Sequence, residues 1–192
     1  TGATTLPKVA GVRIGSRTSN AITLNWNKST AASGYVIEQK QNGKWTNIKK
    51  ISGNSTVTYR VANLSAGKSY DFRVKAFTWD NTTRTSVHSD YANVTGATIL
   101  PKVSGVKIKS RTSNAITLGW NRSTAASGYI IEQKQNGKWV NIKKISGNST
   151  VTYRVENLSA GRYYDFRIKA FTWDSDTKTS MHGNYTNVTG AT

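Results

Sequence analysis

Cysteine is absent from the 192 residues, and the sequence holds only two histidines, two prolines and nine acidic side chains. Without a thiol the chain has no disulfide, thiolate zinc site, iron–sulfur cluster or catalytic cysteine. Two histidines cannot supply a three-histidine metal site, and we expect no cofactor. No apolar run reaches the roughly 18 residues of a membrane helix, and the first residues lack a basic-then-apolar signal pattern. We therefore expect no transmembrane segment.

Acidic residues are also scarce relative to basic ones. Lysine and arginine together number 27 against nine acids, which gives a formal net charge of +18. Such a field attracts polyanions, for example teichoic acid, sulfated glycan, anionic membrane or nucleic acid, with strong salt dependence. The alternative is that lysines on strand edges prevent aggregation and keep the chain soluble. No DNA-reading helix or known nucleic-acid-binding pattern occurs, so we expect no specific nucleic-acid partner.

The sequence is internally repeated. The segment Leu6–Trp26 returns as Leu100–Trp120, 94 residues further on, and 75 of the 94 paired positions are identical. A span of this size is a common length for one domain. We therefore expect two modules, at residues 1–94 and 95–192, joined by a short linker at about 95–99 that limits their relative motion. A further Thr-Gly-Ala-Thr at Thr189–Thr192 suggests that the chain comes from a longer array.

Apolar residues within each module alternate with polar ones, and helical periodicity is absent. In Tyr70–Ala76, for example, every second side chain is apolar, and Ile22, Leu24 and Trp26 show the same period of two. Turn residues separate these runs, and Asn42-Gly43 is a strong signal for a hairpin. About seven short strands with turns every 8–12 residues predict an all-β fold, an antiparallel sandwich of two sheets in each module.

Several of these residues carry a resemblance to the fibronectin type III family, an immunoglobulin-like β-sandwich. Trp26 ends the second predicted strand, Gly34-Tyr35 opens the third, and Leu64–Ala76 is similar to the family's corner between its fifth and sixth strands. The resemblance implies that Tyr70, and Tyr164 in the second module, bonds a nearby backbone group through its hydroxyl. Two features depart from the family: alanine replaces its usual proline at 66 and 160, and no Arg-Gly-Asp precedes the last strand.

Candidates for catalysis are few. Glu38 and Asp71 fall on outward strand positions beside Arg73 and Lys75, where cross-strand ion pairs are a simpler interpretation than a catalytic dyad. The two histidines lie near the last strand of each module among Ser, Thr and Asp or Asn, which indicates a solvated position rather than a metal site. No phosphate-binding loop or nucleophile elbow occurs. We expect no enzymatic activity from this chain.

Aromatic residues outside the predicted core are the remaining candidates. Phe77 and Trp79 leave the inward set of their strand, and Trp45 follows the Asn-Gly hairpin. Exposed flat rings beside polar groups can stack on sugars, although they can also pack over lysine stems or the other module. The candidate contacts for a glycan or polyanion are Trp45, Phe77, Trp79, Asp80, Arg73 and Lys75, with Trp139, Phe171, Trp173, Asp174, Arg167 and Lys169 in the second module.

The resemblance extends to modules of secreted or cell-surface bacterial proteins that act on carbohydrates. It implies a non-catalytic spacer or display pair, extracellular or on the cell surface, whose partners are neighbouring domains of a larger protein. The alternative is a module that binds polysaccharide or an anionic cell-wall polymer through its basic and aromatic face. In either case we expect a monomer.

Overall fold

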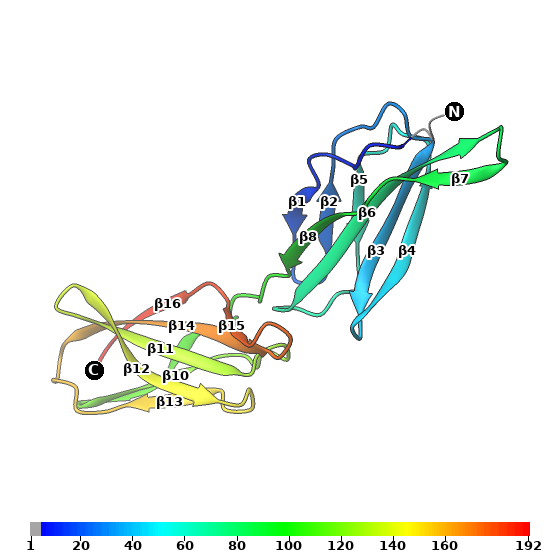
Figure 1. Cartoon of the computed structure of the whole chain (residues 1–192). Coiled ribbons are helices and arrows are strands. Elements are labelled where there is room, and N and C mark those ends of the chain that lie inside the picture. Colours follow the sequence, from blue (N-terminus) through cyan, green and yellow to red (C-terminus); the bar gives the residue numbers. More distant parts are fainter. Residues whose placement is uncertain (1–4) are drawn as a thin grey trace. The chain divides into compact units, whose positions relative to one another are not determined.

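The computed structural model describes residues 5–192 and resolves them into two compact units (Figure 1). The first unit runs through Leu64 and continues with Ser69–Thr98, whereas the second comprises Ser65–Lys68 and Ile99–Thr192. Each unit consists of antiparallel strands in two sheets, so the predicted all-β sandwich is confirmed. Within residues 5–192, no helical segment has the length and apolar character that crossing a bilayer requires.

The first module builds a three-stranded sheet and a five-stranded sheet. The three-stranded sheet has the order β1 (Arg13–Arg17), β2 (Ile22–Asn25), β5 (Thr58–Val61). The larger sheet has the order β4 (Lys44–Ser52), β3 (Gly34–Gln41), β6 (Ser69–Asp80), β7 (Thr85–His88), and β8 (Ala92–Ala97) also pairs with β6.

The second module repeats this arrangement strand for strand. Its smaller sheet contains β9 (Lys107–Thr112), β10 (Ala115–Gly119) and β13 (Thr152–Val155). Its larger sheet contains β12 (Lys138–Ser146), β11 (Gly128–Gln135), β14 (Tyr163–Asp174), β15 (Thr179–His182) and β16 (Thr186–Ala191).

The final strand of the first module is divided into β7 and β8, so the module has eight strands where about seven were expected. Both pieces pair with the long strand β6. Between them, the Ser89 N–H donates to the Ala76 carbonyl at 3.0 Å, and its Oγ accepts from the Ala76 N–H at 2.9 Å. Pairing of β8 continues to Ala97, so part of the segment expected as a linker belongs to a strand.

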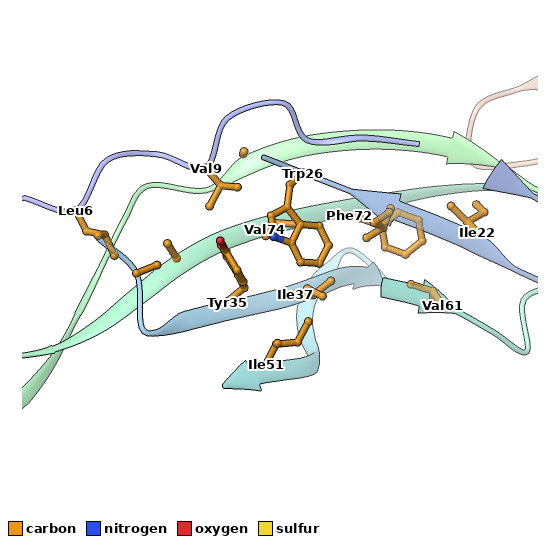
Figure 2. Close-up of a cluster of buried hydrophobic side chains, with 14 residues drawn as sticks. Leu6, Val9, Ile22, Trp26, Tyr35, Ile37, Ile51, Val61, Phe72 and Val74 are labelled. Carbon is orange, nitrogen blue, oxygen red and sulfur yellow. The ribbon is translucent and has the colours of Figure 1, made fainter. Parts of the chain in front are cut away.

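The core of each module lies between its two sheets. In the first module, Ile22 and Leu24 from the small sheet are buried against Phe72 and Val74 from the large one (Figure 2). The predicted inward positions are thereby confirmed. Each such side chain contributes roughly 1.5–3 kcal/mol through removal of its apolar surface from water.

Two tyrosine hydroxyls find backbone partners, whereas among residues 5–192 the buried indole nitrogens of Trp26 and Trp120 have no hydrogen-bond partner. The Tyr35 hydroxyl accepts from the Ser29 N–H at 2.9 Å and donates to the Asn54 carbonyl at 3.2 Å. In the second module, the Tyr164 hydroxyl accepts from the Ser159 N–H at 2.8 Å and donates to the carbonyl of the same residue at 3.3 Å. The corner bond that the resemblance implied is therefore confirmed for Tyr164.

The two modules keep the same bulge in their first strand with different residues. In the first module, a Cβ on Gly15 would lie 2.4 Å from the Asn25 side chain, which occupies the space. In the second module, the glycine and the larger side chain have exchanged strands. A Cβ on Gly119 would lie 2.5 Å from the Lys109 side chain. Two of the differences between the copies are thus one compensated exchange across a strand pair.

Candidate functional site: the outer face of the large sheet

The sequence-predicted site residues of each module meet, for the most part, on the outer surface of the large sheet. Because side chains alternate along a strand, the outward residues of β6 follow one another as Arg73, Lys75, Phe77 and Trp79. Neighbouring strands and the segment before β8 add further residues. We name this surface the aromatic–cationic face: Trp45, Lys50, Arg73, Lys75, Phe77, Trp79 and Tyr91, with Trp139, Lys144, Arg167, Lys169, Phe171, Trp173 and Tyr185 in the second module.

Arg73 is held between two aromatic rings. Its guanidinium carbon lies 4.4 Å from the Trp45 ring centroid and 3.7 Å from that of Tyr91. In the second module Arg167 lies 4.4 Å from the Trp139 centroid and 3.9 Å from that of Tyr185. A guanidinium stacks well on aromatic faces, so both tryptophans pack on the protein's own cation.

The same arginine is paired with a carboxylate. Arg73 Nε and Nη2 lie 2.7 and 2.5 Å from Glu38 Oε2, and the Tyr91 hydroxyl donates to Oε1 at 2.5 Å. Burial alone raises the pKa of Glu38, but the hydrogen bonds from Tyr91 and Arg73 outweigh it and hold the pKa below its ordinary value. Glu132 is bound in the same way by Arg167 and Tyr185. The expected cross-strand ion pair is confirmed for Glu38, whereas among residues 5–192 no ion pair of Asp71 is formed.

Phe77 and Phe171 are buried, at 9% and 8% exposure, so the expectation of exposed rings at these positions is wrong. The reason is a glycine opposite each ring in the register, Gly34 for Phe77 and Gly128 for Phe171. A Cβ on Gly34 would lie 2.7 Å from the Phe77 ring, which shows that the ring covers the bare backbone of β3. Alternation correctly assigns Phe77 to the outer side of the sheet, but it cannot show that the ring packs over a glycine of the neighbouring strand.

Two lysines cover the centre of the face. Lys50 and Lys75 both pair with Val36 in the register and so flank this outward valine, which is only 5% exposed. The Lys50 ammonium lies 4.6 Å from the Phe77 centroid, and that of Lys75 lies 4.8 Å from the Tyr91 centroid. Among residues 5–192, no carboxylate lies within ion-pair distance of either lysine.

Trp79 and Trp173 are exposed, as expected, at 53% and 56%. Each lies on the part of its strand that extends past the third strand of the module and pairs only with the short strand that follows. Figure 1 shows this projecting hairpin of β6 and β7. The indole therefore stands at the tip of the aromatic–cationic face.

Asp80 and Asp174 accept hydrogen bonds from backbone N–H groups in the turns of these hairpins. Asp80 Oδ1 accepts from the Thr82 N–H at 2.8 Å, and this bond lowers the pKa of the carboxyl. Asp174 accepts from the Asp176 N–H at 3.0 Å and is only 3% exposed. At this exposure Asp174 offers a ligand little surface, and its contact with one stays a prediction.

The remaining titratable groups named from the sequence also have internal roles. His88 and His182 lie against Phe77 and Phe171, and burial followed by the neighbouring lysines lowers the pKa of both imidazoles. Asp71 accepts a hydrogen bond from the Thr95 hydroxyl at 2.6 Å. In the described part of the chain, no three histidine, aspartate or glutamate residues gather as a metal site would require.

Family comparison agrees with this architecture. The model of the fibronectin type III domain matches residues 7–90 and again residues 101–182. The chain belongs to the fibronectin type III family. A two-domain fibronectin type III segment from chicken tenascin superposes with a TM-score of 0.73, at 16% identity, over 96% of this chain and 99% of that one. Domains of this family are generally non-catalytic modules.

Curated fibronectin type III relatives come from very different proteins. Chitinase A1 of Niallia circulans is 30% identical over 175 residues, which span 87% of this chain and 24% of that protein. Exoglucanase B of Cellulomonas fimi is 25% identical over 182 residues, 87% of this chain and 15% of that protein. The striated-muscle M-protein of Gallus gallus is 28% identical, over 86% of this chain and 12% of its own length. The chain thus spans under a quarter of each.

Sequence reasoning missed two residues of the face, Tyr91 at the end near Arg73 and Lys50 at the end near Trp79. Tyr91 precedes β8, so strand alternation assigns it to no face, although its ring and hydroxyl hold Arg73 and Glu38 together. Lys50 is one lysine in a basic sequence until the register places it beside Val36. Strand register is the signal that would have found Lys50, and it cannot be read from one sequence. Tyr91 lies between β7 and β8, and no strand pattern places it.

Proposed function

We propose that this fibronectin type III pair is a non-catalytic spacer and display element of a larger protein that is extracellular or on the cell surface. The observation that carries the proposal is that each module closes its own core and uses its strand carboxylates internally. Glu38 pairs with Arg73 and accepts a hydrogen bond from Tyr91, while Asp71 accepts one from Thr95. A module of this kind supplies length and a stable surface rather than reacting groups.

The comparisons support the proposal in two ways. The relatives are several times longer than this chain, which fits a pair that connects other parts of a protein. Two of them are named for the breakdown of polysaccharides, and this fits a location outside the cell. Neighbouring domains are then the main partners, and the pair itself acts as a monomer.

A second candidate function is binding of a glycan or anionic polymer through the aromatic–cationic face. The exposed indoles of Trp79 and Trp173 favour it, because a tryptophan half in water contributes little to the fold of its own module. Spacing and binding use different features of the chain and are measured independently.

A distance measurement tests the spacer role. The chain has no cysteine, so spin labels can be attached at Lys44→Cys and Lys138→Cys, two exposed and equivalent positions in the two modules. If the short connection limits motion, the distance distribution between the labels has one narrow peak. A flexible Gly-Ser insertion after Ile99 should broaden that peak. An already broad distribution in the unmodified chain would overturn the spacer proposal.

A further inference from the structure

We propose that the tip of each aromatic–cationic face binds a polysaccharide that carries carboxylate groups, such as a polyuronate. In the first module the sugar ring stacks on Trp79, and its carboxylates meet Lys50 and Lys75. In the second module Trp173, Lys144 and Lys169 take these parts. The inference rests on the second candidate function and names its ligand class.

The indole supplies the stacking surface. Trp79 and Trp173 are 53% and 56% exposed, whereas the other tryptophans on the face pack against an arginine of their own module. A flat ring with a free side offers its face to the C–H groups of a sugar, and the gain comes from displaced water and close contact. This position is therefore available to a ligand without rearrangement of the module.

The lysines supply the charge. The ammonium of Lys50 lies 4.6 Å from the ring centroid of Phe77, and Phe77 precedes Trp79 by two residues on the same side of β6. Two residues along a strand advance by about 7 Å, so indole and ammonium flank neighbouring positions of an extended chain. The same contact in the second module, Lys144 to Phe171, measures 4.8 Å. Neither ammonium has a carboxylate partner among residues 5–192, so an external carboxylate would not have to displace one of the protein's own.

Carboxylate fits this site better than phosphate. Arginine is the side chain best suited to bidentate phosphate recognition, but Arg73 and Arg167 are committed to Glu38 and Glu132. The cations left for a ligand are lysines, which act as point charges. A nucleic acid would also need several stacking platforms in succession, and each face offers one exposed indole.

Retardation of the intact chain in gels containing polygalacturonate tests the proposal, and titration calorimetry gives the dissociation constant. Methyl-esterified polygalacturonate has the same sugar rings without the charge and should bind at least about tenfold more weakly. Polyphosphate is the control for charge without a sugar ring. High salt should weaken binding of polygalacturonate without abolishing it, because the stacking contact is not screened.

Two sets of variants assign the contacts. Trp79→Ala/Trp173→Ala and Lys50→Gln/Lys144→Gln should each weaken binding about tenfold or more. The matched controls are Lys49→Gln/Lys143→Gln, which removes the same charge from the opposite side of the same strands, and Tyr163→Ala, which removes an exposed ring at the far end of β14. These controls should bind within about twofold of the unchanged chain. Thermal unfolding confirms that every variant is folded.

Three outcomes would overturn the proposal. The first is no retardation by polygalacturonate at low salt. The second is equal binding of the methyl-esterified polymer, which would make the site one for neutral glycans. The third is equal loss in the tryptophan variant and the lysine controls, or tighter binding of polyphosphate, which would leave only general charge attraction. The label-to-label distance is unaffected by any of these results, so failure here leaves the spacer role standing.

Discussion

The aromatic–cationic face of each module has two halves that are built from similar residues in opposite ways. In the clamped half, Trp45 and Tyr91 enclose Arg73, and Glu38 neutralises it. In the open half, Trp79 is exposed, and Lys50 lies over the Phe77 ring with no carboxylate partner among residues 5–192. Both halves recur in the second module.

The difference shows that an aromatic ring beside a cation does not by itself mark a binding site. Where a carboxylate completes the group, the interaction stabilises the fold and leaves nothing for a ligand. Where no carboxylate is present, the same residue types remain able to bind an external anion. Substitutions that affect one half and spare the other test this division.

The largest loss of stability is expected from a substitution at Gly34, over which the Phe77 ring packs between the two halves. A Cβ at Gly34 would lie 2.1 Å from the Ile51 carbonyl oxygen, a backbone atom that cannot turn aside, and 2.7 Å from the Phe77 ring. We expect Gly34→Ala to lower the free energy of unfolding of the first module by about 3 kcal/mol. Denaturant unfolding measures the loss.

A second glycine substitution controls for the change of residue type. Around Gly43, in the hairpin turn, nothing lies within 4 Å of the added Cβ, and only its positive φ of 78° opposes the change. Gly43→Ala should therefore cost about 1–2 kcal/mol. Equal losses for Gly34→Ala and Gly43→Ala would show that neither the Ile51 carbonyl nor the Phe77 ring needs the space that a glycine leaves on β3.

The next effect concerns the clamped half. Glu38→Gln keeps the size of the side chain but removes the charge that Arg73 and Tyr91 bind. Because hydrogen bonds to a charged group contribute more than neutral ones, we expect a loss of about 1.5–3 kcal/mol by denaturant unfolding. Asp71→Asn, which removes a half-buried carboxylate that accepts one hydrogen bond from Thr95 on the same sheet, should cost less, about 1 kcal/mol. If the contacts of Glu38 with Arg73 and Tyr91 did not stabilise the fold, Glu38→Gln and Asp71→Asn would give the same small loss.

Acid should weaken the clamped half as well. The pKa of Glu38 and Glu132 in the folded state lies below the ordinary value of 4.5, so each stabilises the fold fully above that value. This contribution is lost as the pH falls through the folded pKa. The stability difference between the unchanged chain and Glu38→Gln/Glu132→Gln should therefore be constant at neutral pH and shrink below about pH 4. A difference that persists unchanged at low pH would contradict the assignment.

The sequence predicts the fold more fully than the site, for physical reasons. Alternation along Tyr70–Ala76 separates inward from outward residues because burial acts locally on each strand. Whether an outward residue is available depends on its cross-strand neighbours instead. Phe77 is buried because β3 has a glycine opposite it. Trp45 on β4 is occupied because Arg73, which lies on β6 beyond β3, packs against its ring. Register sets both facts.

The smallest change in stability is expected in the open half, where it is most informative. Trp79→Ala should change the free energy of unfolding by no more than about 0.5 kcal/mol, because the indole is 53% exposed. Trp45→Ala removes a ring from the face of Arg73 and should cost about 1–2 kcal/mol. Thermal unfolding of the two variants compares tryptophans of one face directly. A loss for Trp79→Ala as large as that for Trp45→Ala would make the tip part of the fold's own packing, and the stacking surface proposed for a sugar would then be committed to the protein.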